Sequence, residues 1–494
     1  MSLVLFAALA VPVAAAEKVA LLIGNGDYRS VPELKNTIND ATDLSDTLKG
    51  IGFDTTLLIN ATGAELRATL EKFAFKAETA DLALIYFAGH GVEVQGENFL
   101  IPVDASVKSN QDVVQQAVSL RDFLHAADKA RTMRIVILDS CRNNPFGDLV
   151  DIAQASDGAT GGRSTRGVGG LAPPSPDRGT LVAFAARDGN VALDGEGDNS
   201  PFAMALMDKM KQPGLEISLM FRAVRDEVLK STSNRQEPHT YGSLSGIPFY
   251  LASLKNPAAG GSVQGLQGRI DAWSKVQPDL EKQYQVLAED DDTRALYALA
   301  MMHLHPDSPR YDPEKARGYL ERASTLGSAE SLYELGRLYE TGIGAPKDDA
   351  KALSYYQKAA RLDYGAALND MGIFQLEGML GLAPDLDRAL QYFRRAAEQH
   401  SPQAMFNYAT MIDDHRVPGK TAADAASYFY QALRAGNPDV YAALLRHHST
   451  LEPATRKALQ KKLKENAFYA GPVDGDFGPG TQRGLRAAYG LTGG

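Results

Sequence analysis

Two hydrophobic runs decide the fold, and each is followed within three residues by a side chain that can do chemistry. The first is Leu82-Ala-Leu-Ile-Tyr-Phe-Ala-Gly-His90-Gly91, and the second is Ile135-Val-Ile-Leu-Asp-Ser-Cys141. Continuous apolar runs of this length are typical of parallel strands that are covered on both faces. Since reacting groups gather at the carboxyl ends of such strands, His90 and Cys141 both stand where an active site would lie.

Three further apolar runs extend the same pattern, at residues 19–23, 55–59 and 181–184. Between the early runs, residues 39–50 and 64–77 carry apolar side chains at helical spacing, which predicts helices packed on the sheet. We therefore expect an α/β three-layer sandwich with a central parallel sheet over about residues 17–254.

Length and composition exclude several classes of protein. The 494 residues are 44% hydrophobic and 23% charged, which is ordinary globular composition for about three domains. A net charge of −10 and a pI near 5.5 offer no basic footprint for nucleic acid and no polybasic membrane patch. The single cysteine, Cys141, can form neither an intramolecular disulfide nor a multi-cysteine metal site, so it is either inert or a reactive thiol.

The first residues have the pattern of an export signal. Residues 3–16 are almost wholly apolar, are too short to span a bilayer, and end in Ala14-Ala15-Ala16, which signal peptidase could cut. We therefore expect residues 1–16 to be a signal peptide and the protein to be periplasmic or secreted, without a membrane span. Met1-Ser2 lacks the usual positive charge, so a buried first strand or an uncleaved anchor is the alternative.

After a linker and helical lead-in at residues 255–290, the chain repeats itself. The pattern Ala-x-x-Tyr begins at Ala316, Ala352, Ala389 and Ala425, and a small residue recurs at Ala300, Gly336, Gly372 and Ala409. Two independent markers with one period of about 36 residues predict an α-solenoid of helical hairpins over residues 291–450. The unit at 329–359 resembles the Sel-like subclass of tetratricopeptide-related repeats, which implies a protein partner; a rigid spacer is the alternative.

Residues 451–494 predict a further small unit made of a helix, a glycine-rich turn and a helix. The stretch Gly471-Pro-Val-Asp-Gly-Asp-Phe-Gly478, followed by Thr481, resembles the central loop of a small helical peptidoglycan-binding domain. The resemblance implies peptidoglycan as a partner. The family's last helix is cut short at Gly490, so a remnant that does not bind the wall is the alternative.

Five motifs in order resemble the caspase-like cysteine peptidases, with bacterial metacaspase-type members nearest, over about residues 18–254. They are VALLIGN at 19–25, NDA at 39–41, YFAGHG at 86–91, LDSCRN at 138–143 and NSPFA at 199–203. The resemblance implies that Cys141 is the nucleophile, that His90 is the proton donor and acceptor, and that no cofactor is required. The backbone N–H groups of Gly91 and Cys141 would form the oxyanion hole. Taken singly, either residue could instead be structural.

The same resemblance implies an acidic primary pocket that takes Arg or Lys. The matching residues are Asp139, two positions before the cysteine, and Asp40. Two carboxylates would pair well with a guanidinium. Asp40 could instead cap the helix that follows it.

A long polar stretch interrupts the domain at residues 151–178, where six Gly, three Pro and three Ser leave no hydrophobic period. A loop this long inside a domain is usually functional, and related peptidases are often processed between a large and a small portion. Arg163, Arg166 and Arg178 are therefore candidate self-cleavage sites.

Together, these patterns predict an exported caspase-like cysteine endopeptidase that hydrolyses proteins or peptides after Arg or Lys. No metal is required, although Asp194, Glu196 and Asp198 could bind Ca²⁺ as an optional ligand; a solvated acidic loop is the simpler interpretation. The alternative from another class is a catalytically silent scaffold that recruits proteins through its repeats at the cell wall.

Overall fold

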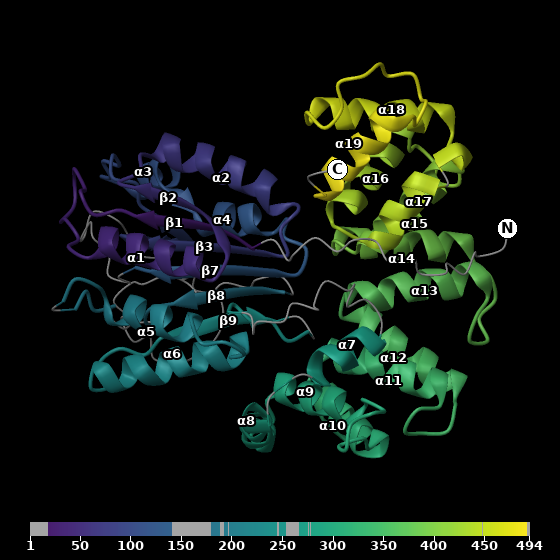
Figure 1. Ribbon diagram of the computed structural model, residues 1–494, viewed down its shortest axis with the longest axis horizontal. Coiled ribbons are helices and arrows are strands. Elements are labelled where there is room, and N and C mark those ends of the chain that lie inside the picture. Colours follow the sequence, from purple (N-terminus) through teal and green to yellow (C-terminus); the bar gives the residue numbers. More distant parts are fainter. Residues whose placement is uncertain are drawn as a thin grey trace, which may run out of the picture. The chain divides into compact units, whose positions relative to one another are not determined.

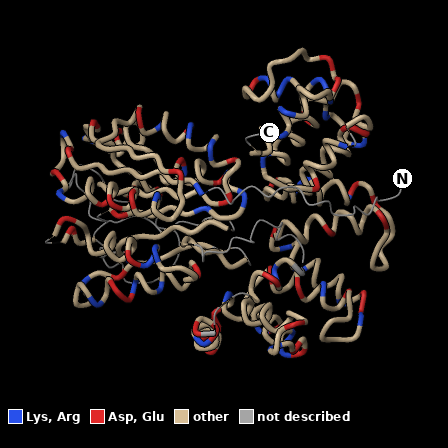
Figure 2. Tube along the Cα trace, viewed as in Figure 1, with Lys and Arg blue, Asp and Glu red and all other residues tan. Residues whose placement is uncertain are grey.

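The computed structural model describes residues 18–140, 179–187, 192–195, 197–244, 247–252, 266–274, 276, 278–446 and 448–491 (Figure 1). The described chain falls into two compact units, residues 18–252 and residues 266–491. Figure 2 shows acidic and basic residues interspersed along the helices of both units. None of the helices in these ranges combines the length and the hydropathy needed to cross a bilayer.

The first unit is built on a six-stranded sheet with the order β2-β1-β3-β7-β8-β9. All neighbouring strands are parallel except β8 and β9, so the predicted central parallel sheet is confirmed and gains one antiparallel edge. The edge strand was not predicted because its sequence, HTYGS, holds no apolar run. The strands are β1 (Lys18–Gly24), β2 (Phe53–Ile59), β3 (Leu82–Ala88), β7 (Met133–Asp139), β8 (Thr180–Phe184) and β9 (His239–Ser243).

Helices cover both faces of this sheet, which confirms the three-layer sandwich (Figure 1). Alternate residues of β3 divide between the two layers: Leu84 packs with Leu44 and Phe202, and Ile85 packs with Phe73 on the other side. Every residue of β3 is buried, as expected for a central strand. One face carries α1 (Thr37–Gly50), α5 (Pro201–Met210) and α6 (Ile217–Ser231), and the other carries α2 (Gly63–Ala77) and α4 (Leu120–Ala127).

A small three-stranded antiparallel sheet begins directly after His90 and was not predicted. Its order is β4-β5-β6, formed by β4 (Gly91–Val94), β5 (Glu97–Leu100) and β6 (Val118–Ser119), and α3 (Asn110–Gln116) precedes β6. Gln95 and Gly96 both have positive φ, as a two-residue hairpin turn requires. This sheet fixes the direction in which the chain leaves His90.

The second unit contains four consecutive helical hairpins, so the predicted solenoid is confirmed. The Ala-x-x-Tyr marker lies on the second helix of each hairpin, and the small-residue marker lies on the first helix. The pairs are α9 (Thr293–His303) with α10 (Pro313–Thr325), α11 (Ala329–Thr341) with α12 (Asp349–Arg361), α13 (Gly365–Glu377) with α14 (Leu386–Glu398), and α15 (Pro402–Asp413) with α16 (Ala422–Arg434); α7 (Leu266–Ser274) and α8 (Pro278–Glu289) precede them.

The small-residue marker has a direct packing cause. A Cβ atom added at Gly372 would lie 2.6 Å from the ring of Phe393, and one at Gly336 would lie 3.1 Å from the ring of Tyr356. Glycine therefore lets an aromatic ring of the second helix pack against the backbone of the first. The period of the sequence reflects this repeated contact.

The C-terminal residues form α17 (Pro438–Arg446), a short 3₁₀ turn at His448–Thr450, α18 (Pro453–Glu465) and α19 (Pro479–Tyr489). The expected order of helix, glycine-rich turn and helix is present in α18 and α19. Leu459 and Leu485 of these helices share one hydrophobic core with Phe429 and Leu433 of α16. The segment predicted as a separate unit at 451–494 is thus packed onto the end of the solenoid.

Candidate active site of the N-terminal domain

The two strands that carry the candidate catalytic residues end side by side. Ala88 of β3 is paired with Asp139 of β7, and the Gly89 N–H donates to the Asp139 carbonyl at 3.2 Å, one residue beyond the strand. His90 comes two positions after Ala88. Cys141 comes two positions after Asp139 in sequence and itself lies outside the described residues, as do Arg163, Arg166 and Arg178.

His90 is buried and is held from two sides. Its backbone N–H donates to the Tyr28 hydroxyl at 2.8 Å, and its Nε2 lies 2.8 Å from the Pro32 carbonyl oxygen. A carbonyl can only accept, so Nε2 carries the proton and Nδ1 carries the lone pair. Nδ1 is buried and makes no hydrogen bond to the described part of the chain.

Burial lowers the pKa of His90 below its ordinary value, and the Pro32 carbonyl opposes part of that effect. The imidazole is therefore neutral at neutral pH. A neutral ring with a fixed tautomer and an unused Nδ1 is what a general base needs.

Tyr28 and Asn25 position this part of the chain, and neither was predicted as a site residue. The Tyr28 hydroxyl and the Asn25 amide both donate to the Ile101 carbonyl, each at 3.2 Å. A Cβ atom at Gly89 would lie 2.6 Å from the Tyr28 hydroxyl, so only glycine allows this approach. Asn25 stands within the quoted motif at 19–25, but nothing in the sequence connects Tyr28 with His90.

Gly91 begins β4, and its N–H direction follows from the pairing. The Ile101 N–H donates to the His90 carbonyl at 3.0 Å, so His90 and Ile101 are a hydrogen-bonded pair. Hydrogen-bonded and non-bonded pairs alternate in an antiparallel ladder, so the Gly91 N–H, opposite Leu100, points away from β5. That direction suits an oxyanion donor, and the role itself stays a prediction.

Asp139 and Asp40 are brought together by Ser200. The Ser200 hydroxyl donates to Asp139 Oδ2 at 2.7 Å, and the Ser200 N–H donates to Asp40 Oδ1 at 2.9 Å. The Tyr86 hydroxyl also donates to Asp139 Oδ2, at 3.0 Å. The alternative role of Asp40 as a helix cap is wrong, because α1 begins at Thr37 and Asp40 lies inside its first turn.

Both carboxyl groups are almost completely buried, with exposed fractions of 2% for Asp40 and 8% for Asp139. Burial, together with the charge of Asp139, raises the pKa of Asp40 to about 8. Burial raises the pKa of Asp139 to about 6, while hydrogen bonds from Ser200 and Tyr86 oppose the rise. No Lys or Arg of the described residues stabilises either charge. The pair therefore holds about one proton at neutral pH, and its role in binding a cation stays a prediction.

The acidic stretch near residue 194 lies against the start of α1. The Asn36 amide donates to the carbonyl oxygens of Asp194, at 2.6 Å, and Gly197, at 3.0 Å. The charge of Asp194 further raises the pKa of both buried carboxyl groups. Glu196 lies outside the described residues, and among the described ones no group of three acidic, His or Cys side chains is arranged to hold a metal.

Comparison with known proteins separates the chain into two parts. The family model of the caspase domain matches residues 17–247. The Sel1 repeat model matches residues 293–328, 329–364 and 365–401, which correspond to the first three hairpins. The fourth hairpin, α15 with α16, follows the matched ranges.

Curated relatives match over limited segments. The human mucosa-associated lymphoid tissue lymphoma translocation protein 1 is 33% identical over 143 residues, which are 28% of this chain and 17% of that protein. Chitin synthase regulatory factor 3 of Schizosaccharomyces pombe is 25% identical over 181 residues, 35% of this chain and 19% of that protein. The chain thus spans less than a fifth of the length of either relative.

Among solved structures, caspase-1 from Spodoptera frugiperda is 18% identical to this chain, with a TM-score of 0.35. The match covers 49% of this chain and 92% of that chain. A Sel1 repeat protein from Oxalobacter formigenes is 20% identical, with a TM-score of 0.33. That match covers 43% of this chain and 91% of that chain. By the family matches and the observed architecture, residues 17–247 form a caspase-like α/β domain, and a helical solenoid with Sel1-like repeats follows it.

Proposed function

We propose that the N-terminal domain is a cysteine endopeptidase that hydrolyses peptide bonds after Arg or Lys. The observation that carries the proposal is the buried Asp40–Asp139 pair, which no described cation neutralises. Asp139 is the last residue of the strand that leads to Cys141. Burying two carboxylates without a cation costs stability, so an arrangement of this kind favours a role in binding.

The proposed chemistry uses a Cys141–His90 dyad. The thiol gives its proton to Nδ1 of His90, and the thiolate attacks the peptide carbonyl. The imidazolium then protonates the leaving amine, which leaves a thioester on Cys141. A water molecule, deprotonated by the same Nδ1, hydrolyses the thioester. The Gly91 and Cys141 N–H groups would stabilise the negative oxygen in both steps.

Specificity follows from the carboxyl pair. A guanidinium presents a planar fork of donors that can bond one carboxylate through two N–H groups and still reach a second one. A bound cation favours the charged form of both carboxyl groups, so the pair releases its proton when substrate binds. A lysine ammonium would bind at the same place as a point charge.

Several further parts of the proposal rest on the sequence. Export to the periplasm or beyond rests on residues 1–16, self-processing rests on the arginines at 163, 166 and 178, and peptidoglycan contact rests on residues 451–494. The helical repeats would bind a protein partner. A calcium ion remains an optional ligand of the acidic stretch near Asp194.

The alternative is a caspase-fold scaffold without peptidase activity. Three of the curated relatives are named as regulators or regulatory factors of chitin synthase, and none of those names describes a peptidase. In this alternative the repeats would carry the function by binding other proteins, and Cys141 would have no catalytic role.

Fluorogenic peptides that end in Arg, Lys or Asp distinguish the two proposals. We expect release after Arg and Lys by the native chain and none by the Cys141→Ala variant, with calcium and with a chelator tested in parallel. Asp40→Asn should lose activity, whereas Asp46→Asn, an exposed acid on the same helix, should retain it. Release only after Asp would overturn the proposed pocket, and silence on all peptides would favour the scaffold.

The same preparations test self-processing on a denaturing gel. The native chain should be cut within residues 151–178, and the Cys141→Ala variant should stay intact. A variant that is nicked equally would show that another protease makes the cut.

A further inference from the structure

The first helices of the solenoid are connected by a series of polar contacts from one repeat to the next. The Tyr297 hydroxyl of α9 donates to Glu334 Oε1 of α11 at 3.3 Å. The Tyr333 hydroxyl of α11 donates to Asp370 Oδ2 of α13 at 2.8 Å. We call the surface formed by these four residues the first-helix face. It combines two carboxyl groups with two tyrosine rings, which are the groups that recognise arginine.

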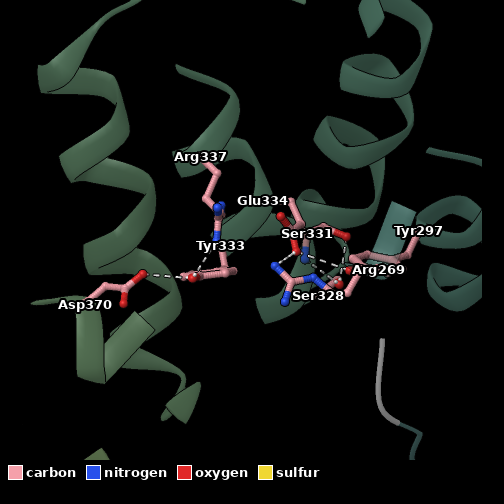
Figure 3. A network of polar contacts seen from close by, with 8 residues as sticks. All are labelled: Arg269, Tyr297, Ser328, Ser331, Tyr333, Glu334, Arg337 and Asp370. Carbon is pink, nitrogen blue, oxygen red and sulfur yellow. Dashed lines mark hydrogen bonds and ion pairs between the residues drawn. The ribbon is translucent and has the colours of Figure 1, made fainter. Parts of the chain in front are cut away.

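Helix α7, which belongs to none of the hairpins, lies on this face and places an arginine there. Arg269 Nη2 lies 2.5 Å from Glu334 Oε1, and its guanidinium carbon lies 5.6 Å from the centre of the Tyr333 ring (Figure 3). Arg269, Ile270 and Trp273 of α7 are all buried, with exposed fractions of 8%, 4% and 0%. The spacing of Arg269 and Trp273 puts both on one side of the helix.

The fit of this arginine is incomplete. Arg269 Nε and Nη2 and Glu334 Oε2 are all buried, and none of them forms a well-directed hydrogen bond within the described part of the chain. A buried ion pair stabilises a fold only when its remaining hydrogen bonds are made, so this pair contributes little net stability. An arginine that lay in the plane of the carboxylate could form a bidentate pair with both oxygens of Glu334.

Two properties of α7 would favour its release, although Trp273 is completely buried. The helix has nine residues, fewer than an isolated helix needs for stability in water. In the sequence it follows a stretch at 256–265 that contains three glycines. If α7 moved away, Glu334 would lose Arg269 as its partner. Water would then hydrate its carboxylate, so the charge would not stay buried and unpaired.

We propose that the first-helix face is a docking site for an arginine-bearing helical segment of a partner protein, and that α7 is an internal occupant which this segment displaces. The partner segment carries an arginine and, four residues later, a large aromatic side chain, as Arg269 and Trp273 do in α7. Its guanidinium binds Glu334 between Tyr297 and Tyr333, and its aromatic ring takes the position of Trp273. The proposal concerns the solenoid alone and does not depend on peptidase activity.

Trp273 is the only tryptophan of the chain, so its fluorescence reports the position of α7 directly. The probe is a peptide of residues 264–276 with Phe in place of the tryptophan, added to the full chain carrying Cys141→Ala so that the peptide stays intact. We expect the emission to move to longer wavelength and to saturate as Trp273 becomes exposed. A second peptide with Lys in place of the arginine should bind about tenfold more weakly, because it lacks the planar fork. Unchanged emission at millimolar peptide would overturn the proposal and identify α7 as a permanent cap of the solenoid.

Two variants test the role of the carboxylate. Glu334→Gln should weaken peptide binding about tenfold, because a charge-assisted pair becomes a neutral one, while Glu377→Gln, an exposed acid on α13, should leave it unchanged. Equal binding by both variants would contradict the proposed site.

Hydrogen exchange on the unmodified chain covers the case in which Glu334→Gln does not fold. The amides of α7 should exchange about tenfold faster than those of α9, and faster still when peptide is present. Equal protection of the two helices would show that α7 does not open.

Discussion

Asp40→Asn should change the number of protons that leave the protein when an arginine ligand binds. The asparagine keeps an oxygen that can accept from the Ser200 N–H, so the contact that holds α5 to α1 is preserved. The substitution removes the group whose pKa is raised to about 8 by burial and by the charge of Asp139. The variant therefore tests the electrostatics of the pair with little change in its geometry.

The expected number of protons follows from the two pKa values, about 8 for Asp40 and about 6 for Asp139. At pH 7 these values leave Asp40 about nine-tenths protonated and Asp139 about one-tenth protonated, which is about one proton in total. A guanidinium in contact lowers a carboxyl pKa by about 1–3, so binding at pH 7 should release between about half of that proton and all of it. For a lowering of about 3, the release should rise to about 1.4 protons at pH 6 and fall to about 0.5 at pH 8. In Asp40→Asn it should be about 0.1 at pH 7.

Isothermal titration calorimetry in two buffers of different ionisation enthalpy measures this release. The titrant is a short peptide ending in arginine amide, and the protein carries Cys141→Ala to prevent turnover. A peptide ending in norleucine amide and the Asp46→Asn variant serve as controls. Binding of the arginine peptide without proton release at pH 7, or with equal release from Asp40→Asn, would refute the assignment of the cation site to this pair.

Four further substitutions test other parts of the molecule. His90→Ala should slow the alkylation of Cys141 at neutral pH, because the thiol loses the base that accepts its proton; an equal rate would contradict the dyad. Gly372→Ala should destabilise the solenoid by about 1–3 kcal/mol in thermal melts followed by circular dichroism, because the added methyl meets an aromatic ring. Gly318→Ala, where a methyl meets nothing, should instead stabilise it by about 0.5–1 kcal/mol. Ser200→Ala removes a hydrogen bond that lowers the pKa of Asp139, so the acidic limb of the kcat/KM profile should move to higher pH.

The sequence predicted the strands that carry an apolar run, including the partly buried edge strand β2, and missed those that carry none. The run 82–88 is apolar throughout because each residue of β3 meets a helix layer on one side of the sheet. In contrast, β9 lies at the edge of its sheet and β6 has only two residues, so neither needs a continuous apolar run. A continuous apolar run therefore identifies a strand of this sheet at its centre and at the β2 edge, whereas a strand without such a run is missed.

The candidate site was predicted residue by residue, but its connections were not. His90, Asp40 and Asp139 each stand in a motif that resembles the caspase-like peptidases. The contact of Ser200 with Asp40 joins residues 160 positions apart, and the contact of His90 with Tyr28 joins residues 62 positions apart. Such contacts depend on the final packing of several elements, and a single sequence holds no local pattern for them.

The shared core of α16, α18 and α19 has a consequence for how the protein could assemble. A stack of helical hairpins has two ends, and each end would present an apolar surface that matches the opposite end of another copy. Such head-to-tail contacts do not close on themselves and would extend into filaments. Leu459 and Leu485 share a core with Phe429 and Leu433 of the fourth hairpin, so the C-terminal helices cover that end of the stack and should prevent such a contact there.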